Sequence, residues 1–282
     1  MQLRVGAEFL YSSTYPTPAT VLVQPHPENI ATILEASWDT NGPMREFLDL
    51  YGNRTVRLVI PTDKSRIRYD ALIAVPDEPD ATDENATQAP IDLLPDDVLH
   101  FTLASRYALS DALMGTAWEL FGGTEPGWAR VQAVCDWIHD NVHYGHEYPS
   151  TPLTTALDTF NQRAGICRDF ANLGVSFCRA LNIPARYVFG YLADVNIPPP
   201  LPPQDFHAWF EVYLSGRWWA KDARFNMPQI GRVPVGRGRD AVDVAMITSY
   251  GPAQLTQMTV ITDEITSETQ RLSEQLAPES AE

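Results

Sequence analysis

The sequence is poor in cysteine, in basic residues and in long apolar runs. Its three cysteines, Cys135, Cys167 and Cys178, are an odd number without a CxxC pair, which excludes a disulfide scaffold and a cysteine-rich zinc site. No apolar run approaches the ~20 residues of a membrane helix. Residues 1–15 hold one basic residue, Arg4, and no run of seven apolar residues, so no secretory signal is expected. We therefore expect a soluble, cytoplasmic protein.

Basic residues are outnumbered, with 20 Lys and Arg against 36 Asp and Glu, a net charge of −16 and a pI of about 4.7. This balance argues against nucleic acid and anionic membranes as partners, because both require a basic face. The excess is concentrated in residues 77–97, with eight acidic and no basic residues, and in residues 263–282, with six acidic and one basic. The other 241 residues carry only −3, so the acidity predicts an exposed linker and a tail.

Hydrophobic residues make up 44% of the chain, enough for a sizeable core in one large or two modest domains. Short apolar or alternating runs at 21–23, 55–61 and 67–75 are separated by prolines and a Gly52-Asn53 turn, which is typical of strands. Helical spacing replaces this pattern later in the chain. We predict a β-sandwich-like domain over 1–76, an acidic linker over 77–97, an α+β core over 98–262 and an acidic tail over 263–282.

Two helices are predicted in the core. Apolar residues recur at helical spacing over 128–142, and again from Cys167 or Arg168 to Leu181. Cys135 and Cys178 fall within these apolar stripes and are interpreted as core thiols. Cys167 stands at the start of the second helix, where the positive end of the helix dipole favours a thiolate over a thiol.

Strands are predicted over 185–192, 206–214 and 217–223, with a further strand near 255–261. Ser215-Gly216 has the form of a two-residue hairpin turn. In that register His207 and Asp222 are diagonal neighbours on one face of the sheet, and a slip of one residue would separate them. Together with Cys167 they have the composition of a nucleophile, a general base and a carboxylate that orients the base. The alternative is an accidental meeting of a core thiol, a structural histidine and a surface aspartate.

Several segments resemble the bacterial transglutaminase-like superfamily. They include residues 163–171 (RAGICRDFA), His207-Ala208-Trp209 and the segment 218–222 (WWAKD). The resemblance extends to 154–157, 179–188, 190–191, 238–245 and, in the β-rich N-terminal region, to 49–53 (DLYGN). It covers roughly residues 1–260.

The resemblance implies a papain-like core, in which the helix bearing the cysteine packs on an antiparallel sheet bearing the histidine and the aspartate. It also implies that Cys167 is the nucleophile, His207 the general base and Asp222 the acid that orients it. The function implied is thiol-dependent acyl transfer on an amide of a peptide, a protein or a small molecule, through a thioester and without a cofactor or metal. Hydrolysis by a peptidase or amidase is favoured over crosslinking, since water needs no acceptor subsite. The alternatives are a protein-glutamine transglutaminase and a catalytically silent interaction module.

The chain departs from the family at one point. Where the family often has Asp-Pro-Thr, this sequence has Asp222-Ala223-Arg224. Arg224 is expected either to pair with one of the many acidic residues or to bind a substrate carboxylate.

Other residues admit more than one role. The backbone N–H of Cys167 is the expected first oxyanion donor, and Asn161 and Gln162 are candidates for the second. Asp169 is explained as a charge favoured at a helix start. Metal binding is not favoured, because neither an HExxH motif nor a calcium-binding loop is present. The remaining candidates are a histidine group (His139, His143, His146), three aromatic residues that line either the core or a cleft (Tyr191, Trp209, Trp218), and a proline-dense loop, 197–203, that is either a spacer or a cleft wall.

Overall fold

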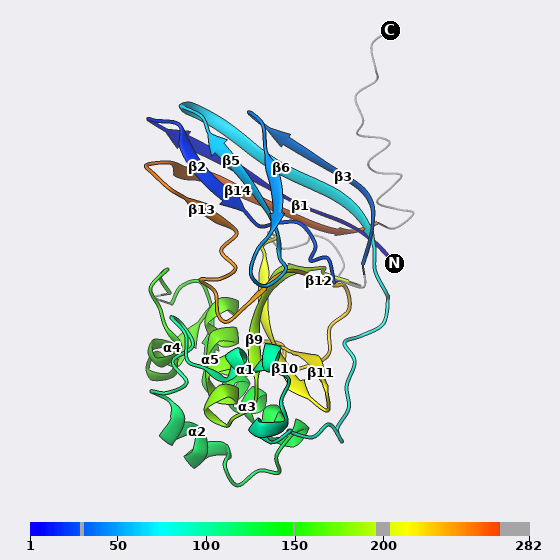
Figure 1. Ribbon diagram of the computed structural model, residues 1–282, viewed down its shortest axis with the longest axis vertical. Helices are drawn as coiled ribbons and strands as arrows, with labels where there is room; N and C mark the ends of the chain where they lie inside the picture. Colours follow the sequence, from blue (N-terminus) through cyan, green and yellow to red (C-terminus); the bar gives the residue numbers. More distant parts are fainter. Residues whose placement is uncertain (29–30, 149, 196–203, 266–282) are drawn as a thin grey trace.

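The structure, a computed structural model, describes residues 1–28, 31–148, 150–195 and 204–265. It has two parts, a β-sandwich and an α+β core that adjoins one end of it (Figure 1). The proline-dense loop at 197–203 and most of the acidic tail lie outside the described residues.

The sandwich consists of two four-stranded antiparallel sheets. Alternation along the first strand shows why they pack: Leu3, Val5 and Phe9 are buried, whereas Arg4 lies on the outside, where it pairs with Asp70 of the adjacent strand at 2.9 Å. The sequence therefore builds a β-rich N-terminal region, as predicted. In spatial order the sheets are β14 (Gln254–Glu264), β1 (Gln2–Ser13), β6 (Asp63–Ala74) and β3 (Thr32–Thr40), and β13 (Ile247–Ser249), β2 (Thr17–Val21), β5 (Arg54–Ile60) and β4 (Arg45–Leu48).

Two strands of the sandwich come from the far end of the chain, which corrects the predicted boundaries. The sequence analysis assigned residues up to 262 to the core, but β14 pairs with β1 from Leu3 to Ser12 and β13 pairs with β2. The core is thus inserted between β6 and β13. Partners about 250 residues apart leave no local periodicity by which the pairing could be predicted.

The core is built on a four-stranded antiparallel sheet against which helix α5 (Cys167–Ala180) packs. The second predicted helix and the strand over 185–192 are confirmed, and the α+β class with them. No helix among the described residues is long and apolar enough to span a membrane. The sheet runs β11 (Arg217–Lys221), β10 (His207–Leu214), β9 (Ala185–Leu192) and β12 (Arg232–Gly238); around it lie α1 (Asp96–Leu99), α2 (Met114–Phe121), α3 (Trp128–Asn141), α4 (Ala156–Gln162), the short parallel pair β7 (His143–Tyr144) and β8 (Ala164–Gly165), and the 3₁₀ turns η1 (Ile91–Leu93) and η2 (His100–Thr102).

The acidic segment 77–97 is mostly exposed, as predicted, but it is hydrogen-bonded to the core and is not a free linker. Its backbone carbonyls at Ala86 and Thr87 accept hydrogen bonds from the N–H groups of Trp128 and Ser215, both at 2.9 Å. The linker was predicted from the acidic composition of the segment. Its attachment uses backbone carbonyls, which composition does not reveal. The segment is therefore a strap along the core surface.

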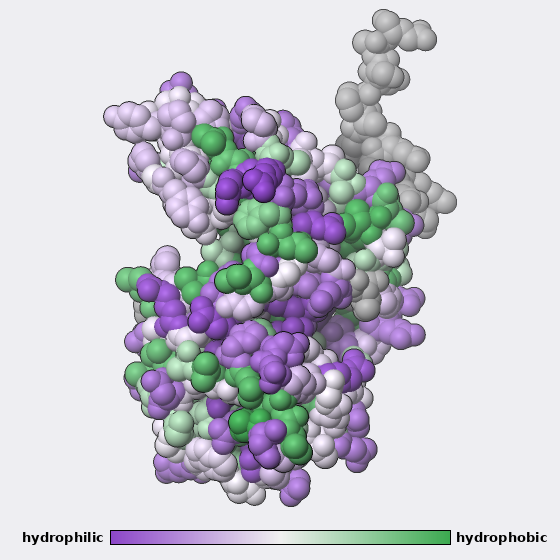
Figure 2. Space-filling model, viewed as in Figure 1, coloured by the Kyte–Doolittle hydropathy of each residue, from purple (hydrophilic) through white to green (hydrophobic). Residues whose placement is uncertain are grey.

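The turn at residues 49–53 of the sandwich is hydrogen-bonded to β12 of the core. The Asp49 carboxylate accepts hydrogen bonds from the N–H groups of Tyr51 and Asn53, and Gly52 provides the positive φ of 75° that this turn requires. The Asn53 side chain then exchanges two hydrogen bonds, of 2.8 and 2.9 Å, with the backbone of Arg237. Figure 2 shows hydrophilic side chains over much of the face where the two parts meet, with an indentation between them.

Candidate active site

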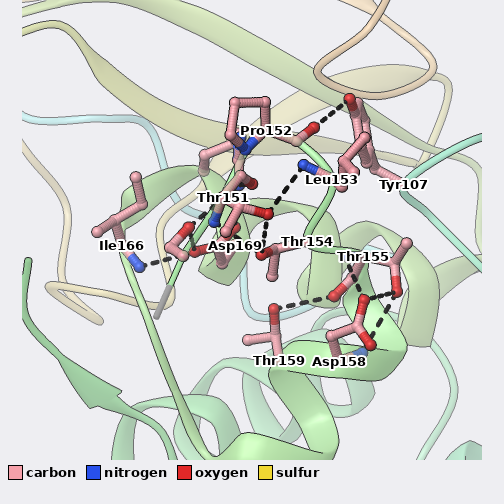
Figure 3. Close-up of polar contacts among 12 residues, drawn as sticks. Tyr107, Thr151, Pro152, Leu153, Thr154, Thr155, Asp158, Thr159, Ile166 and Asp169 are labelled. Carbon is pink, nitrogen blue, oxygen red and sulfur yellow. Dashed lines mark hydrogen bonds and ion pairs between the residues drawn. The ribbon is translucent and has the colours of Figure 1, made fainter. Parts of the chain in front are cut away.

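Cys167 is the first residue of α5, and Asp169 holds the start of this helix in place. One carboxylate oxygen of Asp169 accepts the N–H of Ile166 at 3.0 Å and the hydroxyl of Ser150 at 2.6 Å. Asp169 is 1% exposed, and a Cβ on Gly165 would lie 2.7 Å from its own Cβ, so the glycine makes room for it. Figure 3 shows Asp169 and Ile166 beside the loop that carries Thr151. Asp169 thus has the helix-start role that the sequence predicted.

The three cysteines differ in accessibility. Cys135 and Cys178 are buried, and their burial raises the pKa of Cys135 to about 12 and that of Cys178 well above its usual value. Cys167 is only partly buried. The predicted division into two core thiols and one accessible thiol is confirmed.

His207 and Asp222 are joined by a hydrogen bond of 2.7 Å between Nε2 and Oδ2, and both residues are buried. The hairpin has the predicted register, with Phe210 opposite Lys221 and Leu214 opposite Arg217. Cys167 lies near enough to the same imidazole to help raise the pKa of His207. Because Nε2 is engaged by Asp222, Nδ1 is the nitrogen left for the thiol. The structure therefore brings the three predicted residues together.

The electrostatics of this pair favour its charged forms. Burial of the imidazole lowers the pKa of His207, but the hydrogen bonds with Asp222 and Cys167 outweigh it, and the pKa is raised. Burial raises the pKa of Asp222, yet the hydrogen bond and charge of His207, with the charge of Arg232, bring it well below its usual range. The second oxygen of Asp222 accepts the backbone N–H groups of Arg224 at 3.0 Å and Phe225 at 3.4 Å.

Aromatic side chains surround the site. The rings of Trp209 and Phe225 lie 6.1 and 5.5 Å from the His207 ring, centroid to centroid. The Arg224 guanidinium stacks over Tyr144 at 3.8 Å and over Phe225 at 4.6 Å. Among the described residues no carboxylate lies within ion-pair distance of Arg224, so the expected acidic partner is absent from that part of the chain.

Trp209 is 1% exposed and Tyr191 is fully buried, with its hydroxyl donating to the Val23 carbonyl at 2.9 Å. Tyr191 belongs to the core, whereas Trp209 is buried beside the His207 ring. Trp218 is half-buried against the guanidinium of Arg186 and the ring of Phe101.

The remaining candidates are dispersed. His139 contacts the Arg224 carbonyl at 2.9 Å, and His143 stacks on Tyr148. In the described ranges no group of three potential ligands is close enough to hold a metal. Asn161 and Gln162 are exposed at the end of α4, and within the described chain no hydrogen bond links either to Cys167 or His207.

Sequence reasoning missed one residue of the site. Arg232, the first residue of β12, donates from Nη2 to Asp222 Oδ2 at 3.0 Å. The strand that carries it was not predicted. Its only signal was a basic side chain ten residues after Asp222, and no pattern connects two such positions.

Comparisons with known proteins place the core in a family. The family model of the transglutaminase-like superfamily matches residues 115–223, a range that contains Cys167, His207 and Asp222. The crystal structure of a candidate cysteine protease from Cytophaga hutchinsonii has a TM-score of 0.84 and 33% sequence identity, covering 95% of this chain and 91% of that one.

Two curated relatives match over shorter ranges. An uncharacterised protein of Mycobacterium leprae is 31% identical over 140 residues, which are 47% of this chain and 48% of that protein. An uncharacterised protein of Mycobacterium tuberculosis is 36% identical over 107 residues, which are 34% of this chain and 33% of that protein. The match thus spans half or less of the length of these relatives.

Proposed function

The chain belongs to the transglutaminase-like superfamily, and on that premise we propose that it is a thiol-dependent enzyme that cleaves amide bonds with Cys167, His207 and Asp222. The observation that carries the proposal is the buried His207–Asp222 hydrogen bond of 2.7 Å beside a partly buried thiol. A histidine held in this way has one nitrogen fixed and the other free to exchange a proton with sulfur.

In the proposed reaction the Cys167 thiol gives its proton to His207 as the sulfur attacks the amide carbon. The backbone N–H of Cys167, without a helical acceptor because it opens α5, stabilises the oxyanion. The C–N bond then breaks, the departing nitrogen takes the proton from His207, and a thioester remains. Water gives a proton to His207 and attacks the thioester; the acid leaves and the proton returns to sulfur.

We favour water as the acceptor, with a peptide, a protein or a small amide as substrate in the cytoplasm. Support for hydrolysis comes from the candidate cysteine protease to which the chain is similar over 95% of its length. Transfer to an amine would use the same three residues.

The decisive experiment incubates the protein with a peptide library, with and without an added primary amine, and identifies products by mass. Cleaved peptides support a peptidase, and a gain of about one dalton at glutamine supports a deamidase. Products that carry the added amine would show that the enzyme transfers the acyl group to an amine and does not hydrolyse the thioester. The matched control is Cys167→Ser beside Cys135→Ser, of which only the first should abolish product. If neither the wild type nor the Cys135 variant yields product from any library, the result favours an interaction module or a substrate that is a non-peptide amide.

A further inference from the structure

Arg232 links the candidate catalytic pair to the acidic segment that precedes the core. Its side chain is 6% exposed, and it donates from Nη2 to Asp222 Oδ2 at 3.0 Å and from Nε to Asp80 Oδ2 at 2.7 Å. The guanidinium also lies 4.8 Å from the centre of the Trp209 ring. A buried arginine with two carboxylate partners is a fixed charge.

Asp80 is held in place by the loop before β12. Its own N–H donates to the Gln229 carbonyl, and its carboxylate accepts the Gln229 N–H, both at 2.9 Å. Within the described residues of the segment 77–97, Asp80 is the acidic residue that forms an ion pair with the core. The strap therefore presents one selected carboxylate to Arg232.

We propose that Arg232 and Asp80 are positioning residues, which together set the charge balance of the His207–Asp222 pair, so that the acidic strap is part of the active site. This inference rests on the proposed function. His207 Nε2 and Arg232 Nη2 contact the same oxygen, Asp222 Oδ2, at 2.7 and 3.0 Å. His207, Asp222, Arg232 and Asp80 form a row in that order, and their charges alternate in sign when His207 is protonated.

The row gives the two residues opposite effects. The positive charge of Arg232 stabilises the Asp222 carboxylate but opposes a second positive charge on His207. Asp80 partly neutralises Arg232 and so reduces that opposition. Loss of Arg232 should therefore favour protonated His207, and loss of the Asp80 charge should disfavour it. A role in packing alone gives no reason for opposite signs.

Other charged or titratable groups act on the pair or on its neighbour Tyr144. They stay in place in the variants below and so give a constant background: Cys167 of α5, Cys135 of α3, Tyr144 of β7, Asp205 before β10 and Arg224 after β11.

The test is the pKa of the His207 imidazole, measured by NMR titration and assigned with His207→Gln. Arg232→Met should raise it by about half to one pH unit, because Arg232 contacts the same carboxylate oxygen as His207. Asp80→Asn should lower it by a smaller amount, because Asp80 lies one group further along the row. Arg232→Lys keeps the positive charge, so the pKa of His207 in this variant should stay close to the wild-type value. The matched control is Asp77→Asn, which removes an exposed carboxylate of the same strap and should leave the pKa unchanged.

Shifts in the same direction, or no shift from Asp80→Asn, would overturn the proposal and leave Arg232 and Asp80 as scaffold. If Arg232→Met does not fold, Asp80→Asn alone still decides. Because the titration needs no substrate, a chain without amide-cleaving activity would refute the proposed function and leave the opposite shifts measurable. Where activity is found, its pH profile should move in the same direction as the NMR value in each variant.

Discussion

Replacing Gly174 by alanine tests how closely the cysteine helix must approach the histidine strand. Gly174 lies in α5, and an added Cβ would meet Cε1, Cζ and Cδ1 of Phe210 at 2.5, 2.8 and 2.9 Å. Phe210 is fully buried in β10, so its ring has no free space to enter. The substitution therefore forces the helix and the strand apart or distorts the ring.

Two effects of opposite sign determine the magnitude. Alanine stabilises a helix interior by about 1 kcal/mol relative to glycine. Overpacking of a dense core costs roughly 1–3 kcal/mol. We expect a net loss of about 1 kcal/mol in the free energy of unfolding. Cys167 lies seven residues before Gly174, ~10 Å along the helix, so a tilt of α5 would also move the thiol relative to His207.

The assay is urea unfolding of Gly174→Ala beside Gly115→Ala, a helical glycine of α2 with no atom within 4 Å of an added Cβ. The control should be neutral or gain up to ~1 kcal/mol, so the two variants should differ by about 1–3 kcal/mol. Phe210→Leu should cost less in the Gly174→Ala background than in the wild type, because it makes room for the methyl group. Equal stabilities of the two alanine variants, or additivity with Phe210→Leu, would refute the close contact.

Three further predictions concern reactivity and charge. Iodoacetamide at neutral pH should label Cys167 well before Cys135 or Cys178, which mass spectrometry of digests measures; equal rates would contradict the accessible thiol. Burial and the nearby Arg237 charge lower the pKa of His26 to about 4, so its neutral form stabilises the fold above pH 6.5 and that contribution is lost as the pH falls towards 4. Urea midpoints across this range should fall less steeply for His26→Gln than for the wild type. Glu211→Gln should cost about 2–4 kcal/mol in the same assay, since it removes the buried carboxylate that two partly buried arginines share.

The residues of the site that could be predicted are those placed by short-range sequence patterns. Helical spacing placed Cys167 at the start of α5, and a two-residue turn fixed the register that joins His207 to Asp222. Arg232 could not be predicted in this way, because its contact with Asp222 depends on how β12 pairs with β9 and on where the strap places Asp80. Charge composition described the strap as a linker, and only its tertiary contacts give it another role.

The same division applies to the fold. The predicted strand over 255–261 exists, but the pattern gave no partner for it. Many of its side chains are exposed, so its periodicity does not distinguish the edge of one sheet from that of another. Its assignment to the sandwich comes from its pairing with β1.

The pairing of β1 with β14 imposes an order on synthesis. A ribosome makes β1 first and β14 more than 240 residues later, so during most of translation one edge of β1 has no strand beside it. An open strand edge pairs readily with other chains. The whole core has to emerge before the first sheet is closed, and a chain terminated before residue 254 would keep that edge exposed however well its core had folded.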